Sequence, residues 1–257
     1  SKAFPFREGL GFVKQLKSRA KSLDQGRESF RRQAWLTAFS QLSAADQEAP
    51  LEPEDLQELA ISAHLCGREA DSTDILARAH HGFLSQGNKR SAARCAFWLG
   101  FIAMNNGESA QASGWLARSR RLLEGESDCV ELGYLLLPDA FLAIFAGDVT
   151  SAYETFAKAT SIGDRFGDKD LMTIALNGQG RALIRSGDLT RGLTLLDEAM
   201  ISVTSGEVSP IIAGAVYCSV IESCHETFDL RRAQEWTTAL GEWCETQPEL
   251  VPYGGHC

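Results

Sequence analysis

The stretch IRSGDLTRGL, residues 184–193, places a glycine and an aspartate between two segments that otherwise read as helices. The same arrangement returns in LCGREAD, NNGESAQ and FAGDVTS, and the four glycines stand 40 residues apart, at Gly67, Gly107, Gly147 and Gly187. A fifth copy, ETFDLRR, carries Phe228 at the glycine's place. Repetition at a fixed period is typical of a repeat array and not of a unique active site. Asp188 is therefore predicted to shape a turn.

Each turn joins two helix-length segments of different character. The segment before a turn is apolar, as in SAARCAFWLGFIAMNN (91–106), and the segment after it is amphipathic, as in DLTRGLTLLDEAMISV (188–203). A helical hairpin of this kind cannot bury its apolar face alone, so it stacks on its neighbours. Strand signals are nearly absent. The sequence predicts an all-α fold, a right-handed superhelical α-solenoid of about five hairpins with a 40-residue period.

The residues at the turns have separate roles. A glycine just past the last turn of a helix can take the left-handed backbone conformation, which strains most other residues. An Asp, Glu, Ser or Thr in the next position can accept a hydrogen bond from the free N–H groups of the following helix. We expect the glycines of the repeat to end first helices and the residues after them to cap second helices.

Charge is distributed unevenly along the 257 residues. Residues 1–32 carry nine Lys or Arg against three Asp or Glu, a net charge of +6, so the rest of a chain with net charge −9 carries −15. Such a basic segment could contact nucleic acid or an anionic surface. Its helical apolar stripe favours packing on the acidic body instead, through Phe12, Val13, Leu16 and Leu23. We expect residues 1–34 to form a basic helical cap and residues 35–257 to form the repeat domain.

Composition also narrows the class of protein. With 44% apolar residues and 7 prolines the chain can bury a substantial core. No run approaches the roughly 18 apolar residues of a membrane span, and the N-terminus lacks a secretory signal pattern. The seven cysteines have no C-x-x-C spacing, which favours reduced, buried thiols over a disulfide framework. These features predict a cytoplasmic protein.

Small and bulky residues recur in a frame that resembles the tetratricopeptide repeat. In the best copy, Leu99-Gly100 supplies the small residue of the first helix, Gly107 the turn, Ala112 the small residue of the second helix and Leu116 the bulky one. The same frame contains Ala140, Gly147, Ala152, Phe156 and Ala159, and then Gly180, Gly187, Gly192, Leu196 and Ala199. The period is 40 where the standard repeat has 34, so longer helices or linkers are expected.

Longer phrases resemble the helical-repeat region of bacterial LuxR-type transcriptional regulators, the large kind related in architecture to the maltose regulator. They are GWLARSRRLLE, DCVELGYLLLP, SIGDRFGD, LLDEAMISVTSGEVSPIIAG and FDLRRAQEWTTALGEWC, and the likeness runs from about Trp35 to the end. The resemblance implies a sensor or interaction module followed by a helix-turn-helix domain. Neither that domain nor a phosphate-binding loop is recognisable in these residues. A sixth first helix would begin near residue 254, which predicts either a fragment of a longer protein or an apolar end that pairs with a second copy.

The resemblance also implies a binding groove lined by the first helix of each repeat. Counted back from the turns, the groove positions are Arg94, Phe97, Phe101, Met104, Tyr134, Leu137, Phe141, Asn177, Arg181, Cys218, Glu222 and His225, with Arg185 beside them. Their gradient favours an amphipathic ligand or peptide, with an apolar body on the aromatic side chains and an anionic or polar end near the arginines. The alternative is that many of these residues only bury against the next repeat.

Pro138 has two possible interpretations, and so do the last three cysteines before residue 250. Pro138 either kinks a long helix or stands at a first helical position, and the apolar run before it favours the kink. Cys218, Cys224, His225 and Cys244 could meet in the last repeat and bind a soft metal, although buried structural cysteines are commoner. No nucleophile motif is present. We expect no catalysis, no cofactor and no metal.

Two functions therefore stand. The first is a non-catalytic sensor domain of a LuxR-type regulator, which binds a small amphipathic ligand, a peptide or a protein and contacts DNA only through a domain outside this chain. The second is a free-standing scaffold for protein partners. A second copy of the chain is a further expected partner. DNA binding by these residues alone is not expected, because phosphate contacts need clustered positive charge.

Overall fold

The computed structural model describes residues 20–247 and 249–253, and the regular elements in that part of the chain are all helices. A helical stretch at residues 20–31 comes first. The elements that follow are α2 (Trp35–Glu48), α3 (Pro53–Leu65), α4 (Glu69–Ser85), α5 (Lys89–Asn105), α6 (Ser109–Leu122), α7 (Val130–Tyr134), α8 (Leu136–Ala146), α9 (Val149–Phe166), α10 (Lys169–Arg185), α11 (Leu189–Thr204), α12 (Pro210–Glu226) and α13 (Leu230–Glu245). Within residues 20–247 and 249–253, no helix combines the length and the apolar composition that crossing a bilayer requires.

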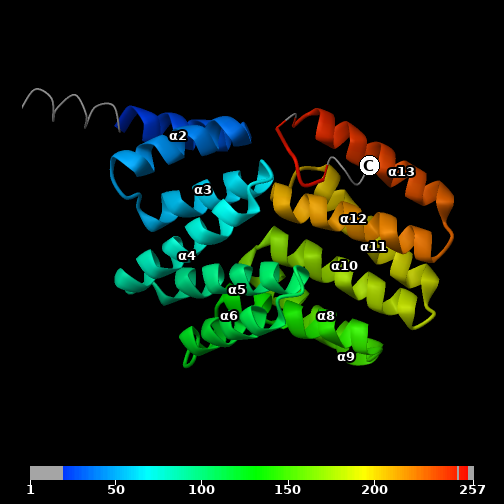
Figure 1. Cartoon of the computed structure of the whole chain (residues 1–257). Helices are drawn as coiled ribbons and strands as arrows, with labels where there is room; N and C mark the ends of the chain where they lie inside the picture. The colour runs from blue at the N-terminus through cyan, green and yellow to red at the C-terminus, as the bar shows by residue number, and fades with distance from the viewer. Residues whose placement is uncertain (1–19, 248, 254–257) are drawn as a thin grey trace, which may run out of the picture. The chain divides into compact units, whose positions relative to one another are not determined.

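The chain divides into two compact units. The first contains the described residues up to Gly87 together with Gln247–Pro252, and the second contains Asn88–Thr246 together with Tyr253. In the first unit, α3 and α4 form a hairpin. In the second unit, α5 pairs with α6, α8 with α9, α10 with α11, and α12 with α13 (Figure 1). Both units are stacks of helical hairpins, which confirms the predicted α-solenoid.

The predicted N-terminal cap contributes a hairpin to the first unit. Phe12, Val13 and Leu16, which motivated that prediction, lie outside the described residues. The described part turns at Gln33, whose φ is 61°, and runs against α2. A Cβ atom on Gly26 would stand 2.7 Å from the Leu42 side chain. Residues 20–48 therefore have the same hairpin form as the segments that follow.

The turns have the predicted conformation. The φ angles of the repeat glycines are all positive, with values of 80° at Gly67, 76° at Gly107, 82° at Gly147 and 92° at Gly187. Phe228, which replaces the fifth glycine, adopts the same left-handed conformation with φ of 57°. The capping prediction is confirmed where the next residue is aspartate, because Asp148, Asp188 and Asp229 each accept from the backbone N–H three residues on. Glu108 makes no side-chain cap.

Small residues hold the two helices of a hairpin close together. A Cβ atom on Gly180 of α10 would stand 2.9 Å from the carbonyl oxygen of Gly192 in α11 and 2.8 Å from the Leu196 side chain. In the α5–α6 hairpin, a Cβ atom on Gly100 would stand 2.8 Å from the Leu116 side chain. These are positions that the tetratricopeptide frame predicted, and the bulky leucine of each second helix fills the space that the glycine leaves.

Pro138 lies early in a helix that follows an interruption. α7 ends at Tyr134 and α8 begins at Leu136, so Pro138 stands in the first turn of α8. A proline cannot donate to the carbonyl group four residues earlier, and that residue is Tyr134, where α7 stops. The predicted bend is therefore a break in the helix at Leu135, and it costs no hydrogen bond inside α8.

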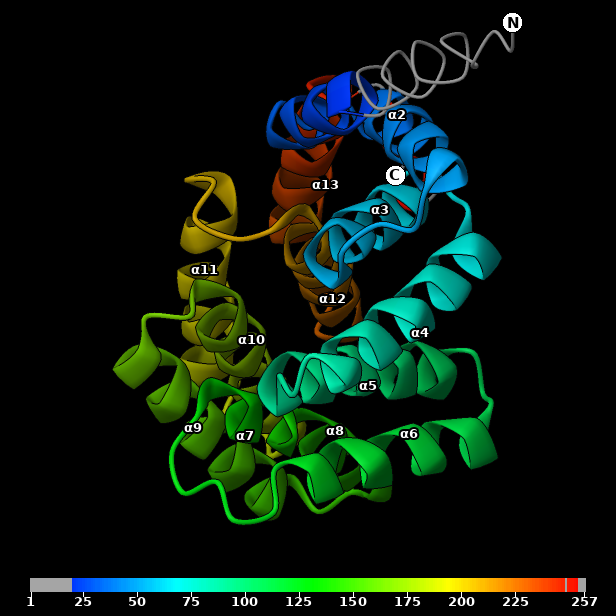
Figure 2. The ribbon, with the colours of Figure 1, turned by 90° about the vertical axis from the view of Figure 1, so that its left-hand side faces the viewer.

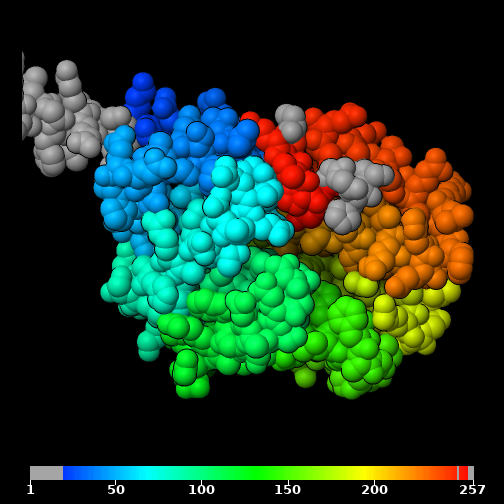
Figure 3. Space-filling model, in the orientation of Figure 1, coloured from blue at the N-terminus to red at the C-terminus, as the bar shows by residue number. Residues whose placement is uncertain are grey.

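The helices of the second unit form two layers. The first helices of the hairpins, α5, α7–α8, α10 and α12, make one layer, and the second helices, α6, α9, α11 and α13, make the other (Figure 2). A continuous core of apolar side chains runs through all four hairpins. In the space-filling view the hairpins follow one another as adjoining bands from green through yellow to orange (Figure 3). The first-helix layer carries every predicted groove residue.

Candidate functional site

The thirteen predicted groove residues fall into two groups by exposure. Phe97, Tyr134, Leu137 and Asn177 are buried in the core of the second unit. The other nine are half-buried or exposed. We call these nine the first-helix face: Arg94, Phe101 and Met104 on α5, Phe141 on α8, Arg181 and Arg185 on α10, and Cys218, Glu222 and His225 on α12. Core packing, the alternative left open by the sequence, therefore describes the four buried residues.

An aromatic cluster underlies the α5 and α8 part of this face. The Phe97 ring stacks on Phe101 with 5.6 Å between ring centres and meets Tyr134 edge-on at 5.3 Å. Phe101 lies 6.0 Å from Phe141, which in turn meets Phe156 of α9 edge-on at 5.0 Å. Pairs of this geometry add roughly 0.5–1.5 kcal/mol beyond their buried area. The half-exposed rings of Phe101 and Phe141 thus stand on a rigid aromatic base.

The Phe156 ring of this cluster packs on α10 at a glycine. A Cβ atom on Gly178 would stand 2.5 Å from the Phe156 ring, so the ring lies directly on the backbone of α10. Asn177, Arg181 and Arg185 follow along that helix. The apolar and the charged parts of the first-helix face are therefore connected through packed side chains.

Arg94 links three consecutive hairpins. The carbon of its guanidinium lies 3.8 Å from the centre of the Tyr134 ring. Its Nη2 atom lies 3.2 Å from Glu131 Oε1 and 3.5 Å from Asp168 Oδ2. The Tyr134 hydroxyl donates to Asp168 Oδ1 at 2.9 Å, and the same oxygen accepts from the Leu171 N–H at the start of α10. Burial raises the pKa of Tyr134, which keeps its hydroxyl a donor at neutral pH.

A row of polar pairs joins α10 to α12. The donors stand one helical turn apart on α10, and each faces a side chain of α12. Asn177 donates to Ser219 at 2.9 Å, Arg181 to Glu222 at 3.2 Å and Arg185 to Glu226 at 3.2 Å. Carboxylates of the same protein therefore neutralise both arginines of α10.

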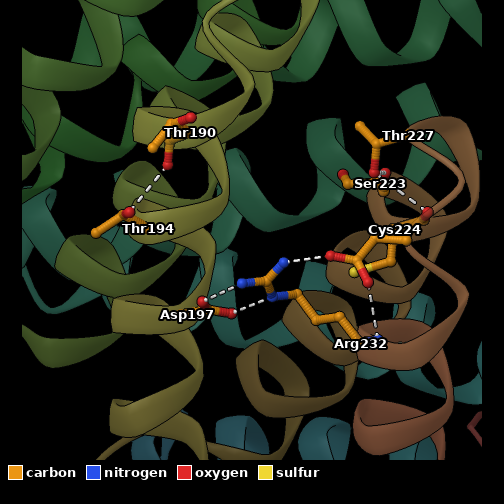
Figure 4. A network of polar contacts seen from close by, with 8 residues as sticks. Thr190, Thr194, Asp197, Ser223, Cys224, Thr227 and Arg232 are labelled. Carbon is orange, nitrogen blue, oxygen red and sulfur yellow. Dashed lines mark hydrogen bonds and ion pairs between the residues drawn. The ribbon is translucent and has the colours of Figure 1, made fainter.

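The ion pair between the second helices of the same two hairpins has a different geometry. Arg232 of α13 donates from Nε and Nη2 to the two carboxylate oxygens of Asp197 in α11, both at 3.0 Å, and its Nη1 contacts Asp229 (Figure 4). Arg181, by contrast, meets Glu222 through one nitrogen, and the Glu222 side chain is 61% exposed. A bidentate pair is held more firmly than a single contact to an exposed carboxylate. The pairs on the first-helix face are the easier ones to open.

The cysteines and the histidine of the last repeat differ in burial. Burial raises the pKa of the Cys224 thiol to about 11, so the reactive thiolate is scarce at neutral pH. Cys224 is buried, while Cys218 and Cys244 are half-buried and His225 is exposed. In the part of the chain that the structure describes, no three His, Cys, Asp or Glu side chains are placed to hold a metal ion.

Sequence reasoning missed several polar partners on these helices. It listed Cys218, Glu222 and His225 of α12 as groove residues, whereas the side chains that pair with α10 are Ser219, Glu222 and Glu226. Glu226 could have been found, because it follows Arg185 by 41 residues, the spacing that separates Phe228 from Gly187. Asp168 and Glu131 were missed as partners of Arg94, since no spacing rule pairs residues across two linkers.

Comparison with known proteins identifies the fold. No family profile matches the chain, and no curated protein matches it. Among solved structures, the Rap conjugation gene regulator of plasmid pLS20, in complex with the Phr* peptide, is similar over 91% of this chain with a TM-score of 0.68 and 12% identity. The apo form of the quorum sensor NprR from B. thuringiensis is similar over 87% of this chain and 75% of its own, with a TM-score of 0.58 and 12% identity.

A signal transduction ATPase with numerous domains from Pyrococcus horikoshii, which carries a tetratricopeptide repeat sensor, is similar over 83% of this chain with a TM-score of 0.55 and 14% identity. The chain spans 65% of the length of the Rap regulator and 33% of that ATPase. At this level of identity the likeness establishes the fold alone. The fold is that of tetratricopeptide-like helical-repeat proteins.

Proposed function

We propose that the second unit is a non-catalytic regulatory module that binds an extended peptide, or such a segment of a protein partner, across its first-helix face. Apart from Arg94 and Cys218, the half-buried and exposed side chains of this face change from aromatic and apolar on α5 and α8 to polar and charged on α10 and α12. A surface with an apolar platform and a few convergent polar groups is the usual form of a ligand site.

The apolar end of the ligand is expected to lie on α5 and α8. Phe101, Met104 and Phe141 are half-buried there, above the buried rings of Phe97 and Tyr134. Because the aromatic base holds these side chains in place, little conformational entropy is lost when a ligand packs on them. An aliphatic or aromatic peptide side chain fits this chemistry.

The other end of the ligand is expected to carry a carboxylate that pairs with Arg181. The Nε atom of Arg181 is buried and has no hydrogen-bond partner among the described residues. Its Nη2 makes a single 3.2 Å contact with the exposed Glu222. A ligand carboxylate that takes the place of Glu222 on Nη2 would form a charge-assisted pair with Arg181, and Glu222 is its competitor.

The neighbours support a peptide as the ligand class and regulation as the role. The Rap regulator was solved with a Phr* peptide, and NprR is a quorum sensor. The resemblance of GWLARSRRLLE and related phrases to LuxR-type regulators supports a cytoplasmic sensor that acts on DNA through a further domain. The coding sequence beyond residue 257 tests this context: a helix-turn-helix supports it, and a stop codon soon after a capping helix supports the free-standing scaffold.

The binding proposal is tested with an array of synthetic ten-residue peptides graded in apolar content and in number of carboxylates. The wild-type chain should prefer peptides with aliphatic or aromatic residues in one half and a carboxylate in the other. Arg181→Gln should weaken binding of these peptides about tenfold, because a charge-assisted pair is lost. Glu222→Gln should strengthen it about two- to fivefold, because the competing carboxylate is removed.

Glu235→Gln on α13 is the matched control, since Glu235 is exposed on a second helix. It should leave the array unchanged. A pattern that is the same for wild type, Arg181→Gln and Glu222→Gln would contradict the proposed carboxylate position, and an array without any signal above background would contradict peptide binding.

A further inference from the structure

A short segment after α13 is bound to the first unit. The chain leaves the helix at Thr246, and Gln247–Pro252 belong to the first unit rather than to the unit of α13. The Leu250 N–H donates to the Gln247 carbonyl at 3.0 Å, which closes one turn. Gln247 and Leu250 are both 7% exposed. In a segment without helix, two side chains buried to this degree are held in place by their surroundings.

Side-chain groups of the segment meet two fixed donors of α2. Gln247 Oε1 accepts from the Trp35 indole N–H at 3.1 Å, in a buried contact. Glu249 Oε2 accepts from the Leu36 backbone N–H at 2.8 Å. That N–H lies at the start of α2, where the N-cap residue Ala34 supplies no side-chain cap and the first turn has no acidic residue. A helix start of this kind favours a carboxylate through its free N–H groups and its dipole.

The end of the segment meets α3. The Val251 N–H donates to the carbonyl oxygen of Leu65, the last residue of α3, at 2.9 Å. This carbonyl is one of those that a helix leaves unpaired at its C-terminus. The Val251 side chain lies over Gly67, where a Cβ atom would stand 2.7 Å from Cγ1. The Val251 side chain therefore packs on the backbone at Gly67 while remaining 57% exposed.

We propose that this surface, formed by Trp35, Leu36, Leu65 and Gly67, is a docking site for a short peptide, and that Gln247 and residues 249–251 occupy it as an internal ligand. The partner that fits is a protein segment with a side-chain amide, a carboxylate two residues later and an apolar residue two further on. Such a segment makes the same contacts from another molecule. The site lies on the first unit and does not depend on the proposed function of the second.

The internal ligand competes with any external peptide for this site. A tethered segment faces its site at an effective concentration of the order of millimolar, so a free peptide of similar intrinsic affinity competes poorly. Weakening the internal segment should therefore expose the site to a peptide in solution. A stronger external segment should displace the internal one.

The test uses a fluorescein-labelled peptide with the sequence of residues 246–253, TQPELVPY, titrated against the full chain by fluorescence anisotropy. The variant Glu249→Lys with Val251→Asp weakens the internal segment and should bind the peptide at least about tenfold more tightly than the wild-type chain. Adding Trp35→Phe to that variant should reduce the affinity, because the indole donor is lost. A peptide with lysine at the position of Glu249 is the matched control and should bind more weakly.

Equal affinity of the peptide for wild type and variant would overturn the proposal. So would the absence of binding to a variant whose circular dichroism and cooperative unfolding match those of the wild type. If the double variant does not fold, Glu249→Gln replaces it, since it removes only the charge at the start of α2. It should raise the peptide affinity about two- to fivefold over wild type, and an unchanged affinity contradicts the site.

Discussion

Glycines inside the helices of this protein lie either in tight contact with a neighbouring helix or in open space. Replacing them with alanine should change the free energy of unfolding in opposite directions. A Cβ atom on Gly180 would stand 2.9 Å from a backbone oxygen of α11, whereas a Cβ atom on Gly114 in α6 would meet nothing within 4 Å. Gly180→Ala should lower the free energy of unfolding by about 1–3 kcal/mol, because the hairpin must open. Gly114→Ala should raise it by about 0.5–1 kcal/mol through helix propensity. Urea denaturation measures both, and equal effects would contradict the close approach of α10 and α11.

Phe228 stands at a turn where the four preceding repeats have glycine. Its φ is 57° and the side chain is 85% exposed, so it bears left-handed strain with little burial in return. Phe228→Gly should raise the free energy of unfolding by about 1 kcal/mol. Gly187→Ala, at a turn with φ of 92° and open space around it, should lower it by about 1–2 kcal/mol. If Phe228→Gly proves destabilising, the exposed ring makes a contact that these turns do not explain.

At the scale of elements, Asp168 is expected to matter more than other capping residues. Asp148 caps α9 only, whereas Asp168 caps α10 and also accepts from the Tyr134 hydroxyl and pairs with Arg94. Asp148→Ala should lower the free energy of unfolding only by the loss of one helix cap. Asp168→Ala should cost about 2–3 kcal/mol, because it also leaves a buried hydroxyl without an acceptor. Equal losses in urea denaturation would show that the junction of the three hairpins is not held by this carboxylate.

Asp170 gives the second unit a dependence on pH. Burial raises the pKa of its carboxyl group above the usual value, although the Ser209 N–H donates to Oδ1 at 2.7 Å. A raised pKa in the folded state means that this group stabilises the fold below the unfolded value of about 3.9 and that the contribution is lost as pH rises through the folded value. Asp170→Asn keeps an acceptor for Ser209 and removes the charge.

The stability of wild type relative to Asp170→Asn should therefore fall as pH rises from about 3.5 to about 7. Urea denaturation of wild type and of Asp170→Asn at the two pH values measures the difference between their free energies of unfolding. The contributions of the other titrating groups are common to both proteins and largely cancel. A difference that grows with pH would mean that the ionised Asp170 is favoured by its surroundings.

Some features of these helices could be predicted from the sequence and others could not. Helix pairs, turns and the close contacts at Gly100 and Gly180 follow from local chemistry and a fixed period, and they were predictable. Of the partners of α10, Glu222 lies at a position counted back from Phe228, whereas Ser219 stands 42 residues after Asn177 and does not follow from the spacing of the turns. The burial of Tyr134 and Asn177 was likewise open, since period alone does not tell a residue that faces a ligand from one that faces the next helix. The segment 247–251 carries no periodic signal at all.

At the scale of the whole molecule, the two units present different surfaces for recognition. The second unit offers an aromatic and charged row on its first helices, and the first unit holds a segment of its own chain at Trp35 and Leu65. A peptide that binds the first-helix face should not need displacement of residues 247–251. Binding at the two surfaces can therefore be told apart by which residues respond to the peptide.

A binding site on the first-helix face is tested by a map of backbone amide chemical shifts in the full chain, recorded with and without the peptide that the array selects. The largest changes should fall on α5, α8, α10 and α12, and Arg181→Gln should reduce them at equal peptide concentration. Changes confined to the second helices α6, α9, α11 and α13, or to the first unit, would contradict a binding site on the first-helix face.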